Sequence, residues 1–259
     1  MSTPYIIKKV EAKVNHAIFD HALVADGDRV MVGLSGGKDS YSLLDVLVSR
    51  RRCLPIRFEL HACHVQAADM DYRADIGFMQ RYCQQHGVPL HLRTIEVQYN
   101  PADRRPACFI CSWKRRKALF TTTKEQGCNK LALGHHLDDT VETLLMNMLN
   151  HASISSIPPM LPMFGDEFRL IRPLTACLDA EMRRYATARQ FPAEVKRCQY
   201  EHDTHRADIR ELIHAMTRIN RNARENMYRS TQHIMEQYIV RATETPTKAR
   251  GAEKHQHEH

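Results

Sequence analysis

The chain has 259 residues, of which 43% are hydrophobic and 26% charged, so it can bury a core of ordinary size and is not globally disordered. Its 37 Lys and Arg against 30 Asp and Glu give a net charge of +7, a balance that favours a polyanionic partner, nucleic acid above all, without requiring one. No run approaches about 18 consecutive apolar residues, which excludes a transmembrane helix and a membrane partner.

The first predicted element is an N-terminal helical segment over residues 1–24. This segment mixes Lys8, Lys9 and Lys13 with Glu11 and has no apolar h-region, which argues against a secretory signal and a transit peptide. We therefore expect a cytoplasmic protein whose thiols stay reduced.

Residues 25–200 alternate short apolar runs with helical periodicities, which is typical of βαβ units. Strands are predicted over residues 29–34, 58–65, 90–95, 130–134 and 170–172. Helices are predicted after the first and fourth strands and over residues 71–86, 112–125 and 178–190. We expect an α/β fold with a doubly wound, mostly parallel sheet and flanking N- and C-terminal helices. Such sheets bind ligands at the carboxyl ends of their strands, here just after Leu34, Val65 and Gly134.

A glycine-rich loop joins the first strand to the helix that follows it. Glycines let backbone N–H groups approach an anion, and the helix N-terminus adds its positive dipole end. Side-chain hydroxyls and a lysine add further donors, so we expect phosphate to be bound by Ser35, Gly36, Gly37, Lys38 and Ser40. Asp39 repels phosphate unless a cation lies between them, which indicates Mg²⁺ held by Asp39. The spacing is not that of a Walker A loop, and the alternative is a glycine-rich turn with Asp39 as a cap.

The sequence Ser-Gly-Gly-Lys-Asp-Ser after a β-run resembles the motif of the PP-loop ATP pyrophosphatases, which have an adenine-nucleotide α-hydrolase-like fold. The resemblance implies that the chain cleaves ATP between its α and β phosphates and adenylates a carbonyl oxygen of its substrate. It implies catalytic roles for Lys38 and Asp39. It also places adenine near Val65, with contacts mainly to the backbone.

Two histidines and two carboxylates follow the fourth strand, in Gly134-His135-His136-Leu137-Asp138-Asp139. This spacing suits a metal or phosphate site that faces the first loop; the alternative is helix capping with solvated histidines. Asp139 is predicted to cap the next helix, with Glu142 completing a capping box. The segment looks like the second element of PP-loop enzymes that act on tRNA. That resemblance assigns Gly134 and His135 to the nucleotide site, and Asp138 or Asp139 to holding Mg²⁺ or positioning the substrate.

The eight cysteines are too scattered for a disulfide framework. Cys108 and Cys111 form a CxxC just ahead of the helix predicted from Ser112, a pattern that fits half a zinc site, a redox pair or part of an iron–sulfur site. A further thiol, Cys198, follows the β/α core, and Val195 precedes it. The remaining cysteines are predicted to be small core hydrophobes: Cys53, Cys63, Cys83, Cys128 and Cys177.

The CxxC lies in a basic segment. Residues 100–120 contain six Lys or Arg against one acid, Asp103. With Phe109 and Trp113 interleaved, this density suits RNA phosphates and unstacked bases. An ordinary solvated helix face is the alternative.

Along residues 25–200 these motifs stand in the order seen in tRNA 2-thiocytidine synthetases (TtcA), together with the Ile157-Pro158-Pro159 loop and Ile171-Arg172-Pro173-Leu174. The chain resembles that family. The resemblance implies an oxygen-sensitive 4Fe-4S cluster with one open iron, held by Cys108, Cys111 and Cys198.

This family resemblance also implies a reaction. ATP and Mg²⁺ adenylate the C2 oxygen of an anticodon-loop cytidine, sulfur replaces that oxygen, and Arg115 or Arg116 offsets the developing negative charge. The implied partners are tRNA and a sulfur donor such as a cysteine desulfurase, and a homodimer is compatible with them.

C-terminal helices are predicted over residues 201–243, and a disordered tail is predicted over residues 244–259. Arginines recur there near helical spacing, which fits a tRNA-contacting face or a solvated face equally well: Arg218, Arg221, Arg224 and Arg229. Two other functions stay open. One is a lysidine-type tRNA ligase without a cluster; the other is a metal-bearing RNA-binding module without catalysis, against which Asp39 argues.

Overall fold

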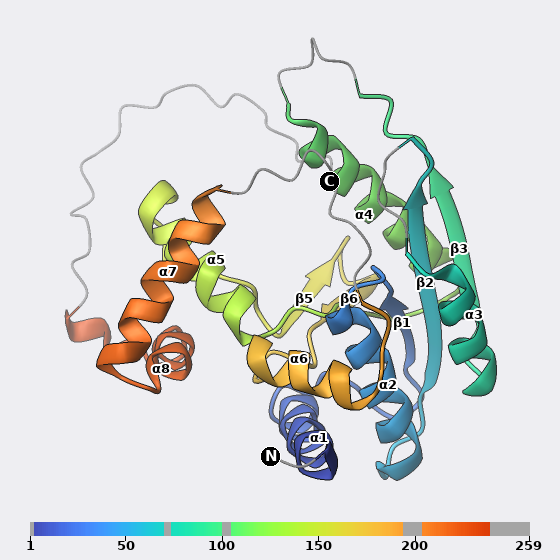
Figure 1. Ribbon diagram of the computed structural model, residues 1–259, viewed down its shortest axis with the longest axis horizontal. Helices are drawn as coiled ribbons and strands as arrows, with labels where there is room; N and C mark the ends of the chain where they lie inside the picture. Colours follow the sequence, from blue (N-terminus) through green and yellow to red (C-terminus); the bar gives the residue numbers. More distant parts are fainter. Residues whose placement is uncertain (1–2, 70–73, 100–104, 194–203, 239–259) are drawn as a thin grey trace.

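The computed structural model describes residues 3–69, 74–99, 105–193 and 204–238 (Figure 1). In chain order the elements are α1 (Thr3–Asp20), β1 (Arg29–Gly33), α2 (Lys38–Cys53), β2 (Glu59–Ala67), α3 (Ile76–Gln85), β3 (Leu90–Ile95), α4 (Ala107–Glu125), β4 (Lys130–Ala132), α5 (Leu137–His151), β5 (Met160–Met163), β6 (Phe168–Ile171), α6 (Asp179–Ala188), α7 (Thr204–Ile219), α8 (Ala223–Ser230) and the 3-10 helix η1 (Glu236–Tyr238). Among these described helices, none is long and apolar enough to cross a bilayer.

The strands form one six-stranded sheet in the order β3-β2-β1-β4-β6-β5. All neighbouring pairs are parallel except β5 with β6, so the predicted mostly parallel α/β sheet is confirmed. β5 was not expected, because its stretch lies in a proline-rich loop. It is an edge strand, the place in a sheet that tolerates a proline such as Pro162. The direction of winding reverses between β1 and β4, and such a reversal opens a crevice at the carboxyl ends of both strands.

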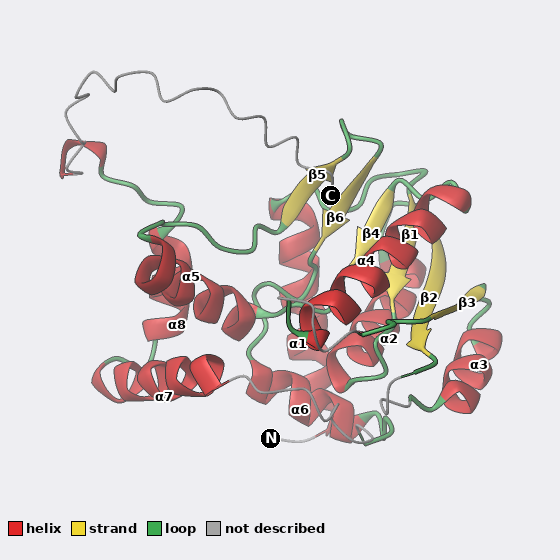
Figure 2. Ribbon diagram, turned by 90° about the horizontal axis from the view of Figure 1, so that it is seen from above, coloured by secondary structure: helices red, strands yellow, loops and turns green. Residues whose placement is uncertain are grey.

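Helices cover both faces of the sheet (Figure 2), which explains why the central strand β1 is an apolar run, Val30-Met31-Val32, that is buried on both sides. On one face Val30 and Val32 of β1 belong to the large core that also holds buried residues of α1, α2, α3 and α6. On the other face Met31 and Leu131 pack with Phe120 of α4. Buried α1 residues such as Val14 are part of the main core, so the N-terminal helix is continuous with the sheet layer.

The helices α5, α7 and α8 pack together to one side of the sheet (Figure 1). Leu137 and Val141 of α5 form a separate apolar cluster with Ile209 and Ile213 of α7. The helical stretch predicted from 204 is interrupted after α7, where the Asn220 side chain accepts a hydrogen bond from the backbone N–H of Asn222 at 2.9 Å. Such local side-chain bonds compete with helical ones and end the helix.

Three predicted helix starts are wrong. α3 begins at Ile76 and not at residue 71, because the Asp75 side chain caps it by accepting a hydrogen bond from the backbone N–H of Phe78 at 2.8 Å. α4 begins at Ala107 rather than Ser112, with Pro106 as its N-cap, so the CxxC lies in the first turns of the helix and not ahead of it. α5 begins at Leu137, because Asp139 is its third residue and accepts a hydrogen bond from the backbone N–H of His136 at 2.9 Å. Asp139 therefore caps the helix as its third residue, by accepting the N–H of the N-cap residue, and the predicted capping box with Glu142 is not formed.

Candidate active site

The loop between β1 and α2 is organised by its own hydroxyl groups. The backbone N–H of Gly37 donates to Ser35 Oγ at 3.2 Å, and Ser40 Oγ donates to the Gly37 carbonyl at 2.8 Å. Gly36 has φ +95°, a left-handed conformation that glycine adopts without strain. No side chain caps the start of α2, whose first N–H groups therefore suit an anion. We call residues 33–40 the phosphate loop.

Lys38 connects two carboxylates at the phosphate loop. Its Nζ lies 2.8 Å from Asp39 and 2.9 Å from Asp179, which is the first residue of α6. Burial lowers the pKa of Lys38, but the bonds to Asp39 and Asp179 outweigh burial and the net pKa is raised. The same ion pair outweighs burial at Asp179 and lowers the pKa of that carboxyl. The Asp179 carboxyl is therefore ionised at neutral pH.

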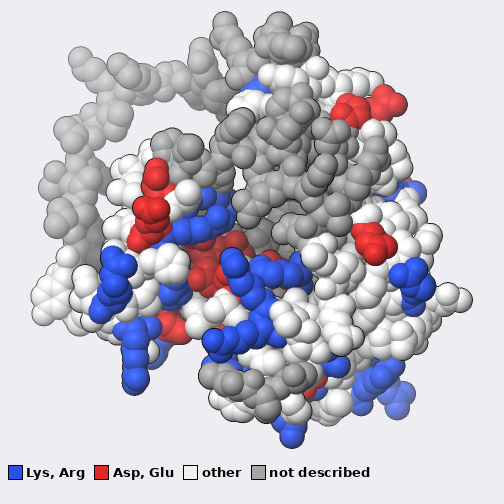
Figure 3. All heavy atoms as spheres, viewed as in Figure 1, with Lys and Arg blue, Asp and Glu red and all other residues white. Residues whose placement is uncertain are grey.

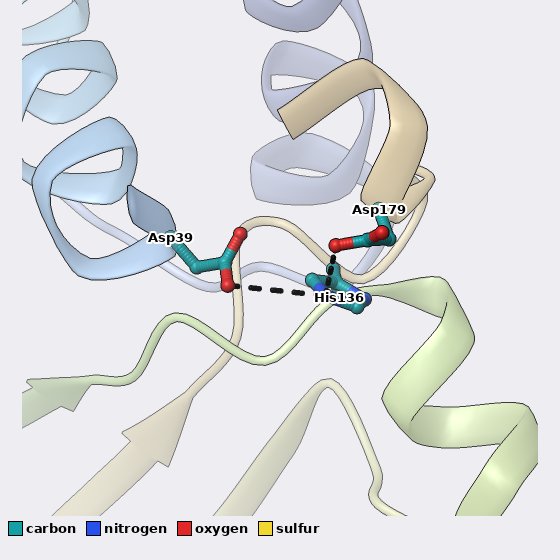
Figure 4. A group of neighbouring side chains, drawn as sticks. All are labelled: Asp39, His136 and Asp179. Atoms are coloured by element: carbon teal, nitrogen blue, oxygen red, sulfur yellow. Dashed lines mark ion pairs between the residues drawn. The ribbon is translucent and has the colours of Figure 1, made fainter. Parts of the chain in front are cut away.

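His136 completes this group (Figure 4). Its Nε2 lies 4.0 Å from an Asp39 oxygen and 3.7 Å from an Asp179 oxygen, and the ligand atoms of all three residues lie within 4.8 Å of one another. Carboxylates attract a divalent cation, and they hold Mg²⁺ better than imidazole does. The three residues thus fit a Mg²⁺ site that faces the phosphate loop, in which Asp39 and Asp179 supply the preferred oxygen ligands.

Asp138 and Asp139 point into the loop that carries His136. Asp139 caps α5, as described above. Asp138 accepts a hydrogen bond from the backbone N–H of Asp179 at 2.7 Å and pairs with Arg224 Nε of α8 at 2.7 Å. In this structure Asp138 connects the β4–α5 turn with α6 and with α8, whereas Asp139 bonds within that turn. Neither acid is a member of the three-residue cation group.

Gly134 brings the two predicted motifs into contact. A Cβ atom on Gly134 would lie 3.1 Å from the carbonyl carbon of Asp39 and 3.2 Å from the backbone nitrogen of Ser40. Those atoms are backbone, so they move only if the start of α2 moves.

We expect Gly134→Ala to displace the phosphate loop, to cost about 1–3 kcal/mol of folding stability and to weaken ATP binding at least about tenfold. Chemical denaturation and ATP titration measure the two effects. Gly77→Ala is the matched control, because its Cβ would meet side-chain atoms and no backbone: Arg81 Nη1 at 3.2 Å and Asp75 Oδ1 at 3.5 Å. Unchanged ATP affinity in Gly134→Ala would contradict the close approach.

A cavity of about 180 Å³ opens at the carboxyl ends of β1, β2 and β4. It is lined by Gly33, Leu34, Ser35, Cys63, Val65, Arg115, Arg116, Leu119, Phe120, Leu133 and His135. The predicted site residues Ser35, Val65, Arg115 and His135 thus share one cavity at the crevice where the sheet changes direction. Burial, and then the charge of Arg172, lower the pKa of His135 to about 4, so this imidazole is neutral at neutral pH.

Charge of both signs gathers around the site. On the face drawn in Figure 3, Lys and Arg side chains surround a recessed group of acidic side chains in the middle of the molecule. A basic rim attracts a polyanion, and recessed acids hold a cation.

A buried histidine stands beneath the cavity. His64 of β2 is 1% exposed, and its Nδ1 donates to the Leu34 carbonyl at 2.7 Å. Burial is the main cause that lowers the pKa of His64 below its ordinary value of 6.5. On acidification the unfolded chain therefore takes up this proton before the folded chain does, and stability is lost as the pH falls below about 6.5.

We expect the wild-type free energy of unfolding to fall between pH 7 and pH 5, with a His64 share of at most about 1.4 kcal/mol per pH unit. His64→Asn retains a donor for the Leu34 carbonyl without a titrating group, and it should fall less steeply. Urea unfolding at several pH values measures both slopes. Equal slopes in the two proteins would show that His64 is not the titrating group.

The described cysteines fall into three groups. Cys108 and Cys111 are half-buried and lie on one face of α4, since residues three apart share a helix face. Cys198 lies outside the described residues. The prediction of buried lone cysteines is confirmed for Cys63, Cys83, Cys128 and Cys177 and is wrong for Cys53, which is exposed at the end of α2.

The structure also places residues that the sequence patterns did not single out. Asp179 reaches the site because α6 packs beside α2. The motif contains both histidines, and the resemblance assigns His135 to the nucleotide site. In the structure His136 belongs to the cation group and His135 lines the cavity. Arg224, predicted to lie on an arginine face, instead turns toward Asp138. None of these contacts follows from sequence spacing.

Comparisons with known proteins agree with this geometry. The PP-loop domain family matches residues 6–216. The tRNA-cytidine(32) 2-sulfurtransferase of Geobacter sulfurreducens is 33% identical over 239 residues, which cover 90% of this chain and 92% of that protein. The one from Acaryochloris marina is 34% identical over 238 residues, covering 88% and 83%. Among solved structures, the U34-tRNA thiolase NcsA from Methanococcus maripaludis with its 4Fe-4S cluster has a TM-score of 0.73 at 22% identity, covering 90% of this chain and 80% of that one.

Proposed function

The chain belongs to the PP-loop domain family and to the tRNA-cytidine(32) 2-sulfurtransferase family, and from this membership we propose that it is an ATP-dependent tRNA thiolase. Its substrate is the cytidine at position 32 of tRNA, in the anticodon loop. The observation that carries the proposal is the cavity at the sheet's change of direction, which brings the phosphate loop beside Arg115 and Arg116 of the cysteine-bearing helix. Thiolation requires the adenylated oxygen, formed at the phosphate loop, and the incoming sulfur to reach the same carbon atom, and this cavity lies between the two elements.

ATP binds at the phosphate loop. The N–H groups at the start of α2, the hydroxyls of Ser35 and Ser40 and the ammonium of Lys38 hold its phosphates. Adenine lies along the β2 end near Val65, which lines the cavity. The cytidine C2 oxygen attacks the α phosphate, pyrophosphate leaves, and the oxygen becomes part of an adenylate. When sulfur then attacks C2, AMP departs with the oxygen, and Arg115 offsets the negative charge that develops.

Asp39 and Asp179 would hold Mg²⁺ once nucleotide is bound. In the described structure Lys38 neutralises both carboxylates. Phosphate oxygens compete for the Lys38 ammonium and so release the carboxylates toward the metal. The role predicted for Asp138 and Asp139 in holding Mg²⁺ then becomes an indirect one, through the backbone of Asp179 and the ring of His136.

We expect Asp179→Asn to raise the Mg²⁺ concentration that gives half-maximal activity by about tenfold or more, with a smaller effect at saturating Mg²⁺. The measurement is thiolation rate against Mg²⁺ at fixed ATP. Asp208→Asn, on the distant helix α7, is the control. If the Mg²⁺ dependence of Asp179→Asn equals that of wild type, Asp179 is not a ligand.

Cys108 and Cys111 fit two of the three ligands of a 4Fe-4S cluster, because both residues are half-buried on one helix face, two turns and one turn before Arg115. Cys198 is proposed as the third. When bound, a cluster with an iron free of protein ligands supplies a place where sulfur is held for transfer. The chain's own contribution is orientation: α4 carries the cysteines and Arg115 along one helix.

The test is anaerobic incubation of the purified protein with ATP, Mg²⁺, a sulfide source, free lysine and unmodified tRNA, followed by mass spectrometry of the nucleosides. The proposal requires 2-thiocytidine that depends on ATP. Lysidine in its place would identify a ligase of the same superfamily, and binding of tRNA without any modified nucleoside would identify an RNA-binding module. Adding a cysteine desulfurase in place of sulfide tests the proposed sulfur donor, and sedimentation of the active protein tests the proposed homodimer.

A further inference from the structure

The outer face of α4 exposes two aromatic rings. Phe109 is 52% exposed and Trp113 is 42% exposed, which is unusual for rings of this size in positions four residues apart. That spacing places them one above the other on adjacent turns of the helix. One turn further on, Lys117 Nζ lies 5.3 Å from the centre of the Trp113 ring. Together they form a ladder of two rings and an ammonium group along the helix, which we call the aromatic ladder.

The surroundings of the aromatic ladder are basic. Between Ala107 and Glu125 the helix carries Lys114, Arg115, Arg116, Lys117 and Lys124, and its only acid is Glu125 at the far end. The ladder therefore offers flat apolar surfaces next to positive charge. An acidic protein partner would match the positive charge of the helix. Unstacked nucleobases linked by phosphates match both features, because the bases stack on the flat rings and the phosphates pair with the charges along the helix.

The aromatic ladder is also next to the proposed active site. Arg116 is exposed on the same side of α4 as Trp113, three residues further along, and it lines the cavity that contains Ser35 and His135. A nucleotide bound in the cavity would thus have its neighbours along the chain within reach of the rings. When a base leaves the stack to react, the neighbouring bases lose the stacking contact that it gave them. An aromatic side chain can replace that lost contact.

We propose that Phe109 and Trp113 form a stacking platform for the unpaired nucleotides that flank the reacting base in an RNA loop, with Lys117 and Arg116 on the adjoining phosphates. The identification of this RNA as a tRNA anticodon loop rests on the proposed function. The platform itself requires only that the ligand is a single-stranded stretch of nucleotides.

Trp113 is the only tryptophan of the chain, so its fluorescence reports on this platform alone. Titrating the full-length protein with an anticodon stem-loop RNA should quench the emission, because a stacked base quenches an indole. A fully paired RNA of equal length and charge should leave the emission nearly unchanged, since its bases are stacked already. Quenching of the same size by both RNAs would overturn the stacking assignment.

Affinity gives the second measurement, by anisotropy of the labelled stem-loop. Trp113→Ala should weaken binding of the loop by about 5- to 150-fold, and Trp113→Phe should retain most of the affinity. Binding of the paired RNA should change little in either variant. Leu149→Ala is the matched control, because Leu149 is 66% exposed on α5, away from α4. Rescue by Trp113→Phe shows that the variant's loss comes from the ring and not from misfolding.

The outcomes separate this inference from the proposed function. If the loop quenches Trp113 but no thiolated nucleoside forms, the platform stands and the thiolase assignment fails. If thiolation proceeds and Trp113→Ala binds the loop within twofold of wild type, the platform is wrong and the thiolase assignment stands. If Trp113→Ala slows only sulfur delivery from a protein donor, with RNA affinity unchanged, the ladder is a protein-docking surface and the proposal is overturned.

Discussion

Lys38→Ala and Asp39→Ala are each expected to abolish ATP-dependent thiolation, lowering kcat by at least about 100-fold. Lys38 is the ammonium at the start of α2, and Asp39 is one of the two carboxylates that it bridges. Lys38→Ala therefore leaves two carboxylates without their cation, and Asp39→Ala removes one of the two proposed Mg²⁺ ligands. The loss should appear both in pyrophosphate release and in nucleoside mass spectrometry. Saturating ATP should restore little activity, because the residues act on the charge that develops at phosphorus and not only on ATP affinity.

Iron content and visible absorbance of the anaerobic protein should be unchanged in both variants, since Cys108 and Cys111 lie on α4 and the substituted residues on α2. The controls are Lys124→Ala and Asp166→Asn, which break the surface ion pairs of Lys124 with Glu167 and of Asp166 with Arg169. Exposed surface pairs of this kind contribute little to stability, so activity should be near wild type. A folded Lys38→Ala protein that thiolates tRNA at a normal rate would remove the phosphate loop from the mechanism.

Cys108→Ala and Cys111→Ala are expected to lose the cluster and, with it, thiolation. Two cysteines on one helix face cannot compensate for each other, because a 4Fe-4S cluster binds each thiolate at a different iron. Iron and sulfide analysis, with electron paramagnetic resonance of the anaerobically reconstituted protein, measures the loss. Binding of ATP should persist, which separates the cluster from the phosphate loop.

Cys83→Ala is the control for these variants. Cys83 is buried between α3 and the sheet, and burial raises the pKa of its thiol to about 11, so it is a poor ligand. Exposed Cys53 serves as a second control, for thiols that bind iron adventitiously. Full iron, sulfide and activity in Cys198→Ala would show that the third ligand is assigned to the wrong residue. Stoichiometric zinc without iron under strict anaerobiosis would exclude the cluster altogether.

Much of this protein follows from its sequence because the relevant interactions are local. The alternation of apolar runs and helical periods predicts the strands of the parallel sheet, and the position of Ser35-Gly36-Gly37 after the first strand predicts a phosphate loop at its carboxyl end. Parallel strands bring their carboxyl ends together, so Val65 and His135 were expected near that loop. Ser35, Val65 and His135 line the same cavity.

Helix starts and side-chain partners were decided by tertiary packing. α4 extends back to Ala107 because Ala107, Ile110 and Cys111 pack against Val97 and Ala67, apolar contacts that a local pattern does not contain. This extension turns the CxxC from a loop feature into one face of a helix.

The sequence also does not predict which charged residues form ion pairs with one another. Asp179 is far from Lys38 along the chain, and only the packing of α6 beside α2 brings its carboxylate to 2.9 Å from the lysine. Arg224 likewise meets Asp138 only because α8 packs on α5. Ion pairs have no sequence periodicity, since they depend on where helices from distant parts of the chain come to lie. The sequence by itself therefore determined the fold class and the phosphate loop, whereas the tertiary structure alone decided which carboxylates share the lysine and which arginine holds the turn beside it.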